Sequence, residues 1–431
     1  MTDPKQIIAE SRMGGFQILA VVLCVLLNAV DGFDVLSISF ASPGVAADWG
    51  ITRATLGIVL SMELIGMAAG SIVIGRFADL FGRRPVIIAS LLTMIGGMLL
   101  AATSSNVTML SSCRFLTGIG IGGMLAAVNA MVAEYSSDRH RNLAVTIMAA
   151  GFPLGAIFGG LFSTILLAHF GWHSVFLLGA GMTLVMLPLV WWFLPESISY
   201  LVNARPPGAL EKINRTLTRM GHTTIDRLPP VPETRPKKAG LFARQWRTML
   251  MIMTVAYFAH IMTFYFILKW IPKIVVDMGF APSTAGGVLV WANVGGAAVA
   301  ILLGLLSQKI DVRTLVITVL VASVAMICIF GMGFDGLTRL AIVAGIAGFF
   351  TNSAVVGLYA LMASNLPTQI RAGGTGFVIG VGRGGAALGP IIAGYLFTAG
   401  AGLQVVAIVM AMGSALAAFV LLFLRKPKLI D

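Results

Sequence analysis

Long apolar runs separated by short polar loops fill almost the whole chain. Each run approaches or exceeds the roughly 20 residues that a helix needs to cross the hydrocarbon core of a bilayer. A transmembrane β-barrel would alternate apolar and polar residues instead, so the runs predict helices. We expect twelve spans, at residues 16–41, 55–77, 85–102, 108–133, 143–168, 172–194, 248–271, 283–307, 314–333, 340–363, 374–398 and 403–424.

A polar segment, 195–247, divides these spans six and six. We therefore predict an all-α integral membrane protein with one six-helix bundle in residues 1–194, a linker in 195–247 and a second six-helix bundle in 248–431. Apolar residues recur at helical spacing inside the linker, which predicts a short helix lying on the membrane surface. These residues are Leu210, Ile213, Leu217 and Met220.

The two halves also repeat each other. Residues Gly75 to Arg84 follow the second span, and residues Gly304 to Arg313 follow the eighth, with glycine and a terminal arginine at the same spacing. Ser137 to Arg141 and Pro367 to Arg371 hold corresponding places after the fourth and tenth spans. A duplicated half explains both pairs, and transporters built from repeats bind substrate near the membrane midplane, between the repeats.

Composition excludes a soluble protein. The chain is 58% hydrophobic and 11% charged, whereas soluble domains carry about 25% charged residues. Its net charge of +12 reflects topology, not nucleic-acid binding, because 23 lysines and arginines fall on one side of the predicted spans and three on the other. The positive-inside rule then places both termini in the cytoplasm.

Charged residues inside the spans are the candidates for chemistry, because a charge at membrane depth costs several kcal/mol and marks ion or substrate paths. Asp31 and Asp34 share one face of the first span, and Asn28 extends that face by a turn. Arg114 enters the fourth span about 9 Å from its outer end. Its depth matches that of Asp31, so we expect the two side chains to meet.

Three motifs carry a resemblance to a known family. Gly75-Arg-Phe-Ala-Asp-Leu-Phe-Gly-Arg-Arg84 resembles the loop signature of the major facilitator superfamily, with Leu80 in place of the usual basic residue. Arg114-Phe-Leu-Thr-Gly-Ile-Gly-Ile-Gly122 resembles the fourth-helix motif that this superfamily associates with proton coupling. Asp31-Gly-Phe-Asp34 resembles the D-G-x-D motif of its aromatic acid:proton symporter family. The resemblance covers essentially the whole chain.

The resemblance implies a proton-coupled importer of an aromatic carboxylate that works by alternating access. The expected proton-coupling residues are Asp31, Asp34 and Arg114, and a proton on Asp31 would free Arg114 to meet the substrate anion. Benzoate, hydroxybenzoates, protocatechuate, vanillate and larger lignin-derived acids all remain open. We expect no cofactor and no metal, a proton gradient as the energy source, a functional monomer and a bacterial inner-membrane location.

Arg383 is the preferred substrate anchor, because it lies about 14 Å into the eleventh span among glycines and its planar guanidinium can hold a carboxylate. Lys269, beside Trp270, is explained by snorkelling at the membrane interface. Glu63 is left open as a second proton site or the partner of an unidentified base. The candidate substrate-binding residues are Asn28, Arg114, His260, Phe264, Tyr265, Trp291, Asn293, Asn352, Tyr359 and Arg383.

A cluster of loop charges is a candidate gate. Glu134 and Arg141 stand two helical turns apart and can pair with each other or with Arg83 and Arg84. Salt bridges of this kind can lock one state of a transporter and break as the loop end opens. The candidate gating residues are Gly75, Asp79, Gly82, Arg83, Arg84, Glu134, Arg141, Asp311 and Arg371.

Other functions of the same fold are a proton-coupled exporter and a sugar:proton symporter. Gly151-Phe-Pro-Leu-Gly155 departs from the Gly-Pro pair of exporters, and D-G-x-D argues against a sugar porter. An enzyme is not expected, since the five histidines are scattered and no hydrolase or metalloprotease motif occurs. Two G-x-G-x-x-G patterns lie inside apolar spans, and we interpret them as helix-packing glycines.

Overall fold

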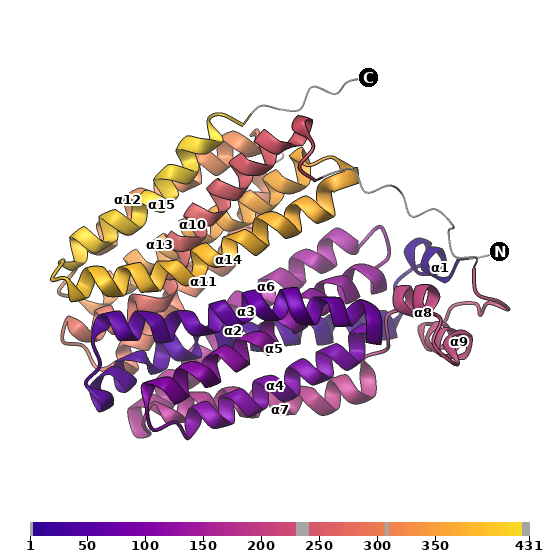
Figure 1. Ribbon diagram of the computed structural model, residues 1–431, viewed down its shortest axis with the longest axis horizontal. Coiled ribbons are helices and arrows are strands. Elements are labelled where there is room, and N and C mark those ends of the chain that lie inside the picture. Colours follow the sequence, from indigo (N-terminus) through magenta and orange to yellow (C-terminus); the bar gives the residue numbers. More distant parts are fainter. Residues whose placement is uncertain (1–2, 230–240, 307–309, 425–431) are drawn as a thin grey trace. The chain divides into compact units, whose positions relative to one another are not determined.

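The computed structural model describes residues 3–229, 241–306 and 310–424, without the side chains of residues 142, 299–306, 368, 369 and 372. Within these ranges the chain is helical and has no strand (Figure 1). The helices are α1 (Pro4–Glu10), α2 (Gly15–Trp49), α3 (Arg53–Phe81), α4 (Arg83–Ala102), α5 (Val107–Tyr135), α6 (Arg141–His169), α7 (His173–Phe193), α8 (Ile198–Ala204), α9 (Ala209–Met220), α10 (Arg244–Asp277), α11 (Pro282–Leu306), α12 (Val312–Gly331), α13 (Leu337–Asn365), α14 (Thr368–Thr398) and α15 (Leu403–Leu421).

Eleven helices in the described ranges are long and apolar enough to cross a membrane: α2 to α7, α10 and α12 to α15. The eighth predicted span, 283–307, corresponds to α11, and its end reaches side chains outside the described ones. The first span is longer than predicted, because α2 continues through Pro43 to Trp49. Membrane helices tolerate an internal proline when neighbouring groups satisfy the freed backbone carbonyl.

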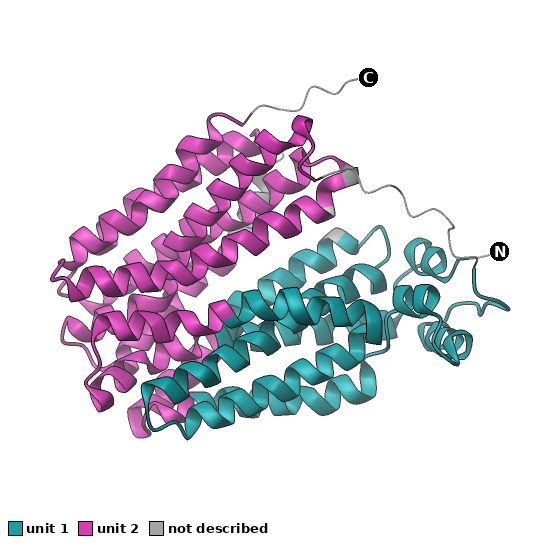
Figure 2. Ribbon diagram, viewed as in Figure 1, with its two compact units in different colours: residues 1–35, 66–156, 176–235 teal, residues 36–65, 157–175, 236–431 magenta. Residues whose placement is uncertain are grey.

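The contacts divide the chain into two compact units (Figure 2). Unit 1 comprises residues 1–35, 66–156 and 176–235, and unit 2 comprises residues 36–65, 157–175 and 236–431. Their boundaries fall inside α2, α3, α6 and α7. The predicted division into bundles 1–194 and 248–431 joined by a linker stays a prediction.

Glycines allow the helices of unit 1 to pack backbone to backbone. A Cβ added to Gly155 of α6 would lie 1.7 Å from the Ala29 carbonyl oxygen of α2. A Cβ added to Gly122 of α5 would lie 2.2 Å from the Met67 carbonyl oxygen of α3. Small residues bring membrane helices close in this way. The glycine-rich sequence after Arg114 therefore packs helices, as expected.

Glycines also allow the helices of unit 2 to pack backbone to backbone. A Cβ on Gly389 of α14 would lie 2.4 Å from the Met262 carbonyl oxygen of α10, and a Cβ on Gly57 of α3 would lie 2.5 Å from the Pro390 carbonyl oxygen of α14. These contacts fix α3, α10 and α14 beside one another, so the side chains between them are removed from solvent.

The linker helix is present as α9, but protein covers its apolar face. Ile213, Leu217 and Met220 are buried within unit 1, and the Arg219 guanidinium lies 5.6 Å from the centre of the Phe16 ring. The helix therefore packs its apolar side against the protein, whereas the apolar pattern had predicted a helix that lies on the membrane surface.

We predict that Gly155→Ala destabilises the protein by about 1–3 kcal/mol, because the added methyl group has no space against α2 and overpacking forces the helices apart. Thermal unfolding in detergent measures the effect. Gly181→Ala is the matched control, since no atom lies within 4 Å of its added Cβ. Equal unfolding temperatures for both variants would contradict the close α2–α6 packing.

Candidate functional site

A buried charged cluster forms in unit 1 between α2 and α5. Asp31, Asp34 and Arg114 are each no more than 1% exposed. Arg114 donates from Nη2 to the backbone carbonyl of Asp34 at 2.8 Å, and its Nη1 lies 3.0 Å from the sulfur of Met98. The structure thus brings the first and fourth predicted spans together at these residues, and their proton-coupling role stays a prediction.

Helix α7 supplies part of this cluster, which the sequence did not reveal. Thr183 donates to the Asp34 carboxylate at 3.4 Å, and a Cβ on Gly179 would lie 2.9 Å from its other oxygen. The ring of Phe176 lies 5.5 Å from the Arg114 guanidinium carbon. These α7 residues recur every three or four positions, so they share the face that packs against Asp34 and Arg114.

Several predicted substrate ligands are hydrogen-bonded between helices. Asn28 donates to the Met148 carbonyl at 2.6 Å in unit 1. In unit 2, the two ring nitrogens of His260 lie 2.9 Å from the Ser414 hydroxyl and from the Thr351 carbonyl oxygen. Asn293 donates to the Leu289 carbonyl of its own helix at 2.9 Å. These bonds support helix packing, and a substrate contact would have to replace or share them.

The remaining substrate-binding candidates, three aromatic residues and Asn352, differ in exposure. Phe264 is buried and packs edge to face with Tyr265 on α10. Trp291 is 55% exposed and lines a pocket of about 260 Å³ between α11 and α13. Asn352 of α13 lies against Gly296 of α11, where a Cβ would come within 2.2 Å of its amide nitrogen.

Arg383 lies beside two tyrosines in unit 2. Tyr257 of α10 and Tyr359 of α13 share a hydrogen bond of 2.9 Å between their hydroxyl groups, and the Arg383 guanidinium is near enough to act electrostatically on both. Its Nη1 is buried without a hydrogen-bond partner among the described residues. Tyr257 was missed by sequence reasoning, because only the packing of α10 against Gly382 places its ring here.

Glu63 of α3 pairs with Lys269 of α10 in unit 2. The Lys269 ammonium lies 3.3 Å from a Glu63 carboxylate oxygen, and both side chains are 0% exposed. Trp270 is also buried and donates to the Pro390 carbonyl at 3.2 Å. The interpretation of Lys269 and Trp270 as interface residues is therefore wrong. Helix α10 continues to Asp277, so Lys269 lies about 12 Å before its end at 1.5 Å per residue.

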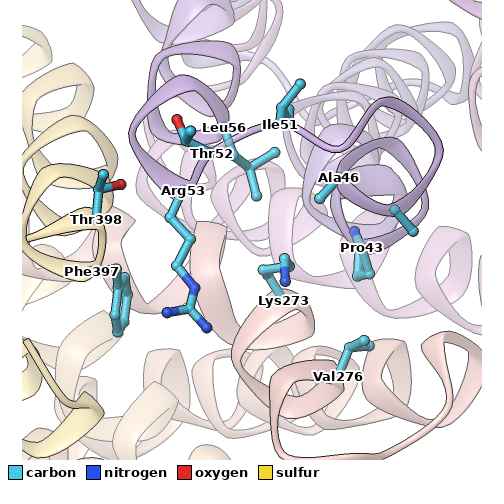
Figure 3. A pocket seen from close by; sticks show the side chains of 11 residues that line it. Pro43, Ala46, Ile51, Thr52, Arg53, Leu56, Lys273, Val276, Phe397 and Thr398 are labelled. Atoms are coloured by element: carbon cyan, nitrogen blue, oxygen red, sulfur yellow. The ribbon is translucent and has the colours of Figure 1, made fainter. Parts of the chain in front are cut away.

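One helical turn beyond Lys269, Lys273 lines a pocket of about 410 Å³ in unit 2 (Figure 3). Arg53 of α3 binds Asp277 at 3.0 Å, and Lys273 forms an ion pair with the same carboxylate. The Arg53 guanidinium lies 5.5 Å from the centre of the Phe397 ring, and Figure 3 shows it extending beside that ring. The pocket lining therefore combines two cations, Arg53 and Lys273, with the aromatic ring of Phe397.

The predicted gate forms a charged cluster at one end of unit 1. Arg83 forms an ion pair with Glu134, which is one of the pairings that the sequence left open for Glu134. Glu134 also accepts a 2.5 Å hydrogen bond from the Ser197 hydroxyl. Arg141 instead pairs with Asp138 at 2.8 Å and donates to the Ala133 backbone carbonyl at 2.9 Å.

Glu196 completes this cluster and was missed from the sequence. Its carboxylate accepts from the backbone N–H groups of Arg83 at 2.8 Å and Ser197 at 2.7 Å. Burial raises the pKa of the Glu196 carboxyl, and these hydrogen bonds act in the opposite direction. Gly82 has a φ of 101° and touches Glu196, so a side chain at Gly82 would be strained and would displace the carboxylate.

Of the other gating candidates, Arg84 belongs to this cluster, because its backbone N–H donates to the Glu196 carboxylate at 3.3 Å. Asp79 is exposed, and a Cβ on Gly75 would meet open space. In unit 2, Asp311 is the residue before α12. Arg371 donates to the Leu366 carbonyl at 3.1 Å. The Arg84 guanidinium donates to the Trp191 carbonyl in unit 1. Their gating roles stay predictions, and residues 307–309 of the second loop lie outside the described residues.

The sequence and the fold of this chain are both similar to those of known transporters. The sequence model of the Major Facilitator Superfamily matches residues 24–335 and 253–430. The chain belongs to this superfamily. It is therefore a multi-pass membrane transporter and not an enzyme, as the sequence predicted.

Superfamily members similar to the chain along its length include three bacterial transporters. It is 31% identical to a gallate transporter of Pseudomonas putida, over 97% of this chain and 94% of the relative. It is 32% identical to a 4-hydroxybenzoate transporter of Acinetobacter baylyi, over 91% and 88%. It is 29% identical to a 3-(3-hydroxy-phenyl)propionate transporter of Escherichia coli, over 94% of each.

The crystal structure of a D-xylose-proton symporter has a similar fold. The TM-score is 0.72 at 16% sequence identity, over 96% of this chain and 99% of that one. This likeness confirms the predicted major facilitator fold.

We predict that Glu134→Gln lowers stability by about 3 kcal/mol, because it leaves the half-buried Arg83 without its carboxylate partner. Asp138→Asn is the control, since its ion pair with Arg141 is exposed and such pairs are worth about 1 kcal/mol or less. Thermal unfolding of both variants measures the difference. A loss for Glu134→Gln no larger than that for Asp138→Asn would contradict the structural role of this cluster.

Proposed function

We propose that this protein imports aromatic carboxylates together with protons by alternating access. The main support is its similarity, over nearly the whole chain, to transporters named for gallate, 4-hydroxybenzoate and 3-(3-hydroxy-phenyl)propionate. Each of those compounds joins an aromatic ring to a carboxylate. A carboxylate at membrane depth needs a cation, and the arginines inside the spans, Arg114 and Arg383, supply that chemistry.

The ring and the carboxylate of such a substrate match the group around Arg383. A planar guanidinium holds a carboxylate through two parallel hydrogen bonds. The buried Nη1 of Arg383 has no hydrogen-bond partner among the described residues, so it can donate one of these bonds. The hydroxyl groups of Tyr257 and Tyr359 can exchange hydrogen bonds with a ring hydroxyl, as each both donates and accepts. We assign substrate anchoring to Arg383 and ring recognition to the two tyrosines.

Proton coupling is assigned to Asp31, Asp34 and Arg114. Two carboxylates and one guanidinium carry a formal charge of −1, so one proton neutralises the cluster. A neutral buried cluster is favoured over a charged one, because burial disfavours the charged form. Each proton that moves down a potential of 100 mV supplies about 2.3 kcal/mol for uptake.

We propose a bacterial inner-membrane location, because the similar transporters are bacterial. The excess of lysine and arginine on one side of the spans supports the placement of both termini in the cytoplasm. We also propose that one chain is sufficient for transport, since the pseudo-repeated halves can supply both sides of a central pathway.

Uptake into liposomes that contain the purified protein tests this proposal. With an inside-alkaline gradient, we expect the parent to accumulate labelled 4-hydroxybenzoate or gallate, and a protonophore to abolish accumulation. Asp31→Asn should accumulate less acid than the parent. For each proton that is no longer coupled, the inside-to-outside concentration ratio of the acid should fall about fiftyfold at a driving force equivalent to 100 mV. The variant should keep exchange of labelled for unlabelled acid.

Glu211→Gln, an exposed carboxylate on α9, is the control and should accumulate the acid as the parent does. Gradient-driven accumulation by Asp31→Asn would remove Asp31 from the coupling site. Failure of the parent to take up any tested acid would overturn the aromatic-acid proposal, and acid extrusion would favour an exporter.

A further inference from the structure

The buried pair of Glu63 and Lys269 has no part in the function proposed above. It lies within unit 2, between α3 and α10, with 3.3 Å between the ammonium nitrogen and a carboxylate oxygen. Neither side chain reaches solvent. The proton-coupling cluster is in unit 1, and the proposed substrate anchor, Arg383, is on α14.

Stability alone is a weak reason for such a pair. Two charges lose their hydration on burial, and replacement of a buried ion pair by apolar residues is often neutral or stabilising. Charged residues inside membrane helices mark ion and substrate paths. The surrounding packing supplies the apolar contacts without the pair, as the buried Trp270 beside it illustrates.

Charge balance determines what the pair can bind. Glu63 and Lys269 together have a formal charge of zero. An anion alone at Lys269 would bring the site to −1, and a proton alone on Glu63 would leave it at +1. Either state buries an uncompensated charge, which costs several kcal/mol. A carboxylate and a proton together restore zero: Glu63 becomes a neutral acid, and the carboxylate takes its place beside the ammonium.

We propose that Lys269 is a second carboxylate-binding site of this transporter, which Glu63 occupies until it takes up a proton. The inference rests on the proposed function for its anionic substrate. No covalent bond changes; one proton binds a Glu63 oxygen, and one ion pair replaces another. When the anion leaves, Glu63 releases the proton and binds Lys269 again.

The neighbouring pocket provides an approach for an anion. Lys273 is four residues beyond Lys269, one turn along the same face of α10, and it lines the pocket of about 410 Å³ together with Arg53 (Figure 3). Its Phe397 wall offers a surface for an aromatic ring. Arg53 and Lys273 already share one carboxylate, that of Asp277, which shows that these two cations can bind such a group together.

Among the described residues, the helices of unit 2 carry few other charges, and Tyr265, one turn before Lys269 on α10, is a further titratable group. Helix α14 packs against α3 through uncharged contacts, including a 2.7 Å hydrogen bond from Ser61 to the Ala387 carbonyl. Its nearest charged residue is Arg383, one turn before Ala387. On α10 the next charges are Lys273 and Asp277, which pair with each other. Helices α11 and α15 carry no charged residue in their sequences, and α13 carries only Arg339 in its first turn.

Calorimetry of 4-hydroxybenzoate binding to the purified protein tests the proposal. Titrations in two buffers of different ionisation enthalpy give the number of protons taken up with each bound acid. We expect Glu63→Gln with Lys269→Gln to bind about thirtyfold more weakly, because the buried cation is lost, and to take up one proton fewer than the parent. This double variant leaves no unpaired charge, so we expect it to fold.

Glu63→Gln with Lys269→Arg is the matched variant, since arginine keeps its proton in proteins. Its buried cation has no competing carboxylate, so it should bind the acid at least as tightly as the parent and still take up one proton fewer. Asp335→Asn, an exposed carboxylate of unit 2, should leave both quantities unchanged.

A parental proton count in both double variants would overturn the inference and leave the aromatic-acid proposal intact. Parental affinity in the Gln-Gln variant would equally exclude Lys269 as a carboxylate site. If the parent bound neither 4-hydroxybenzoate, gallate nor 3-(3-hydroxyphenyl)propionate, the proposed function would fail and the second site with it.

Discussion

Charge buried inside apolar helices is the constraint on which this structure depends. An isolated charge at membrane depth costs several kcal/mol, so every such side chain must lie against a neighbour that offsets it. In unit 1 the Arg114 guanidinium binds the backbone of Asp34 and lies near Phe176. In unit 2 Glu63 and Lys269 bind each other. A ligand or proton that alters one partner must therefore alter the other.

Close helix packing makes these pairings possible. Glycines let α2 contact α6 and let α3 contact α14, with backbone carbonyls where side chains would otherwise stand. Without that approach the polar groups would be too far apart to compensate one another, and each would need water. The many glycines of the chain therefore allow its few intramembrane charges. Tight packing excludes water and places a specific partner beside each charge.

The helices, their approximate limits and the superfamily could be predicted from hydrophobic pattern and motifs. The approach of α2 to α5 could also be predicted, because Asp31 and Arg114 lie at similar depth, whereas the 2.8 Å hydrogen bond from Arg114 to the Asp34 backbone carbonyl was not foreseen. Lys269 could not be paired with Glu63, since 206 residues separate them and the predicted span ended two residues past Lys269. The span continues to Asp277, which turns an apparent interface lysine into a buried one. Glu196 was missed because its partners are backbone N–H groups, which no side-chain pattern reveals.

We propose that each unit holds one buried proton-binding site, and that a carboxylate binds together with the proton at the site in unit 2. One proton neutralises the Asp31, Asp34 and Arg114 cluster, and a second accompanies the carboxylate at Lys269. Two protons with one monoanion carry a net charge of +1. The most direct test is the current across a liposome membrane that contains the protein when 4-hydroxybenzoate is added outside. We expect an inward positive current whose reversal potential corresponds to two protons per acid; electroneutral uptake, with no current, would contradict coupling to two protons.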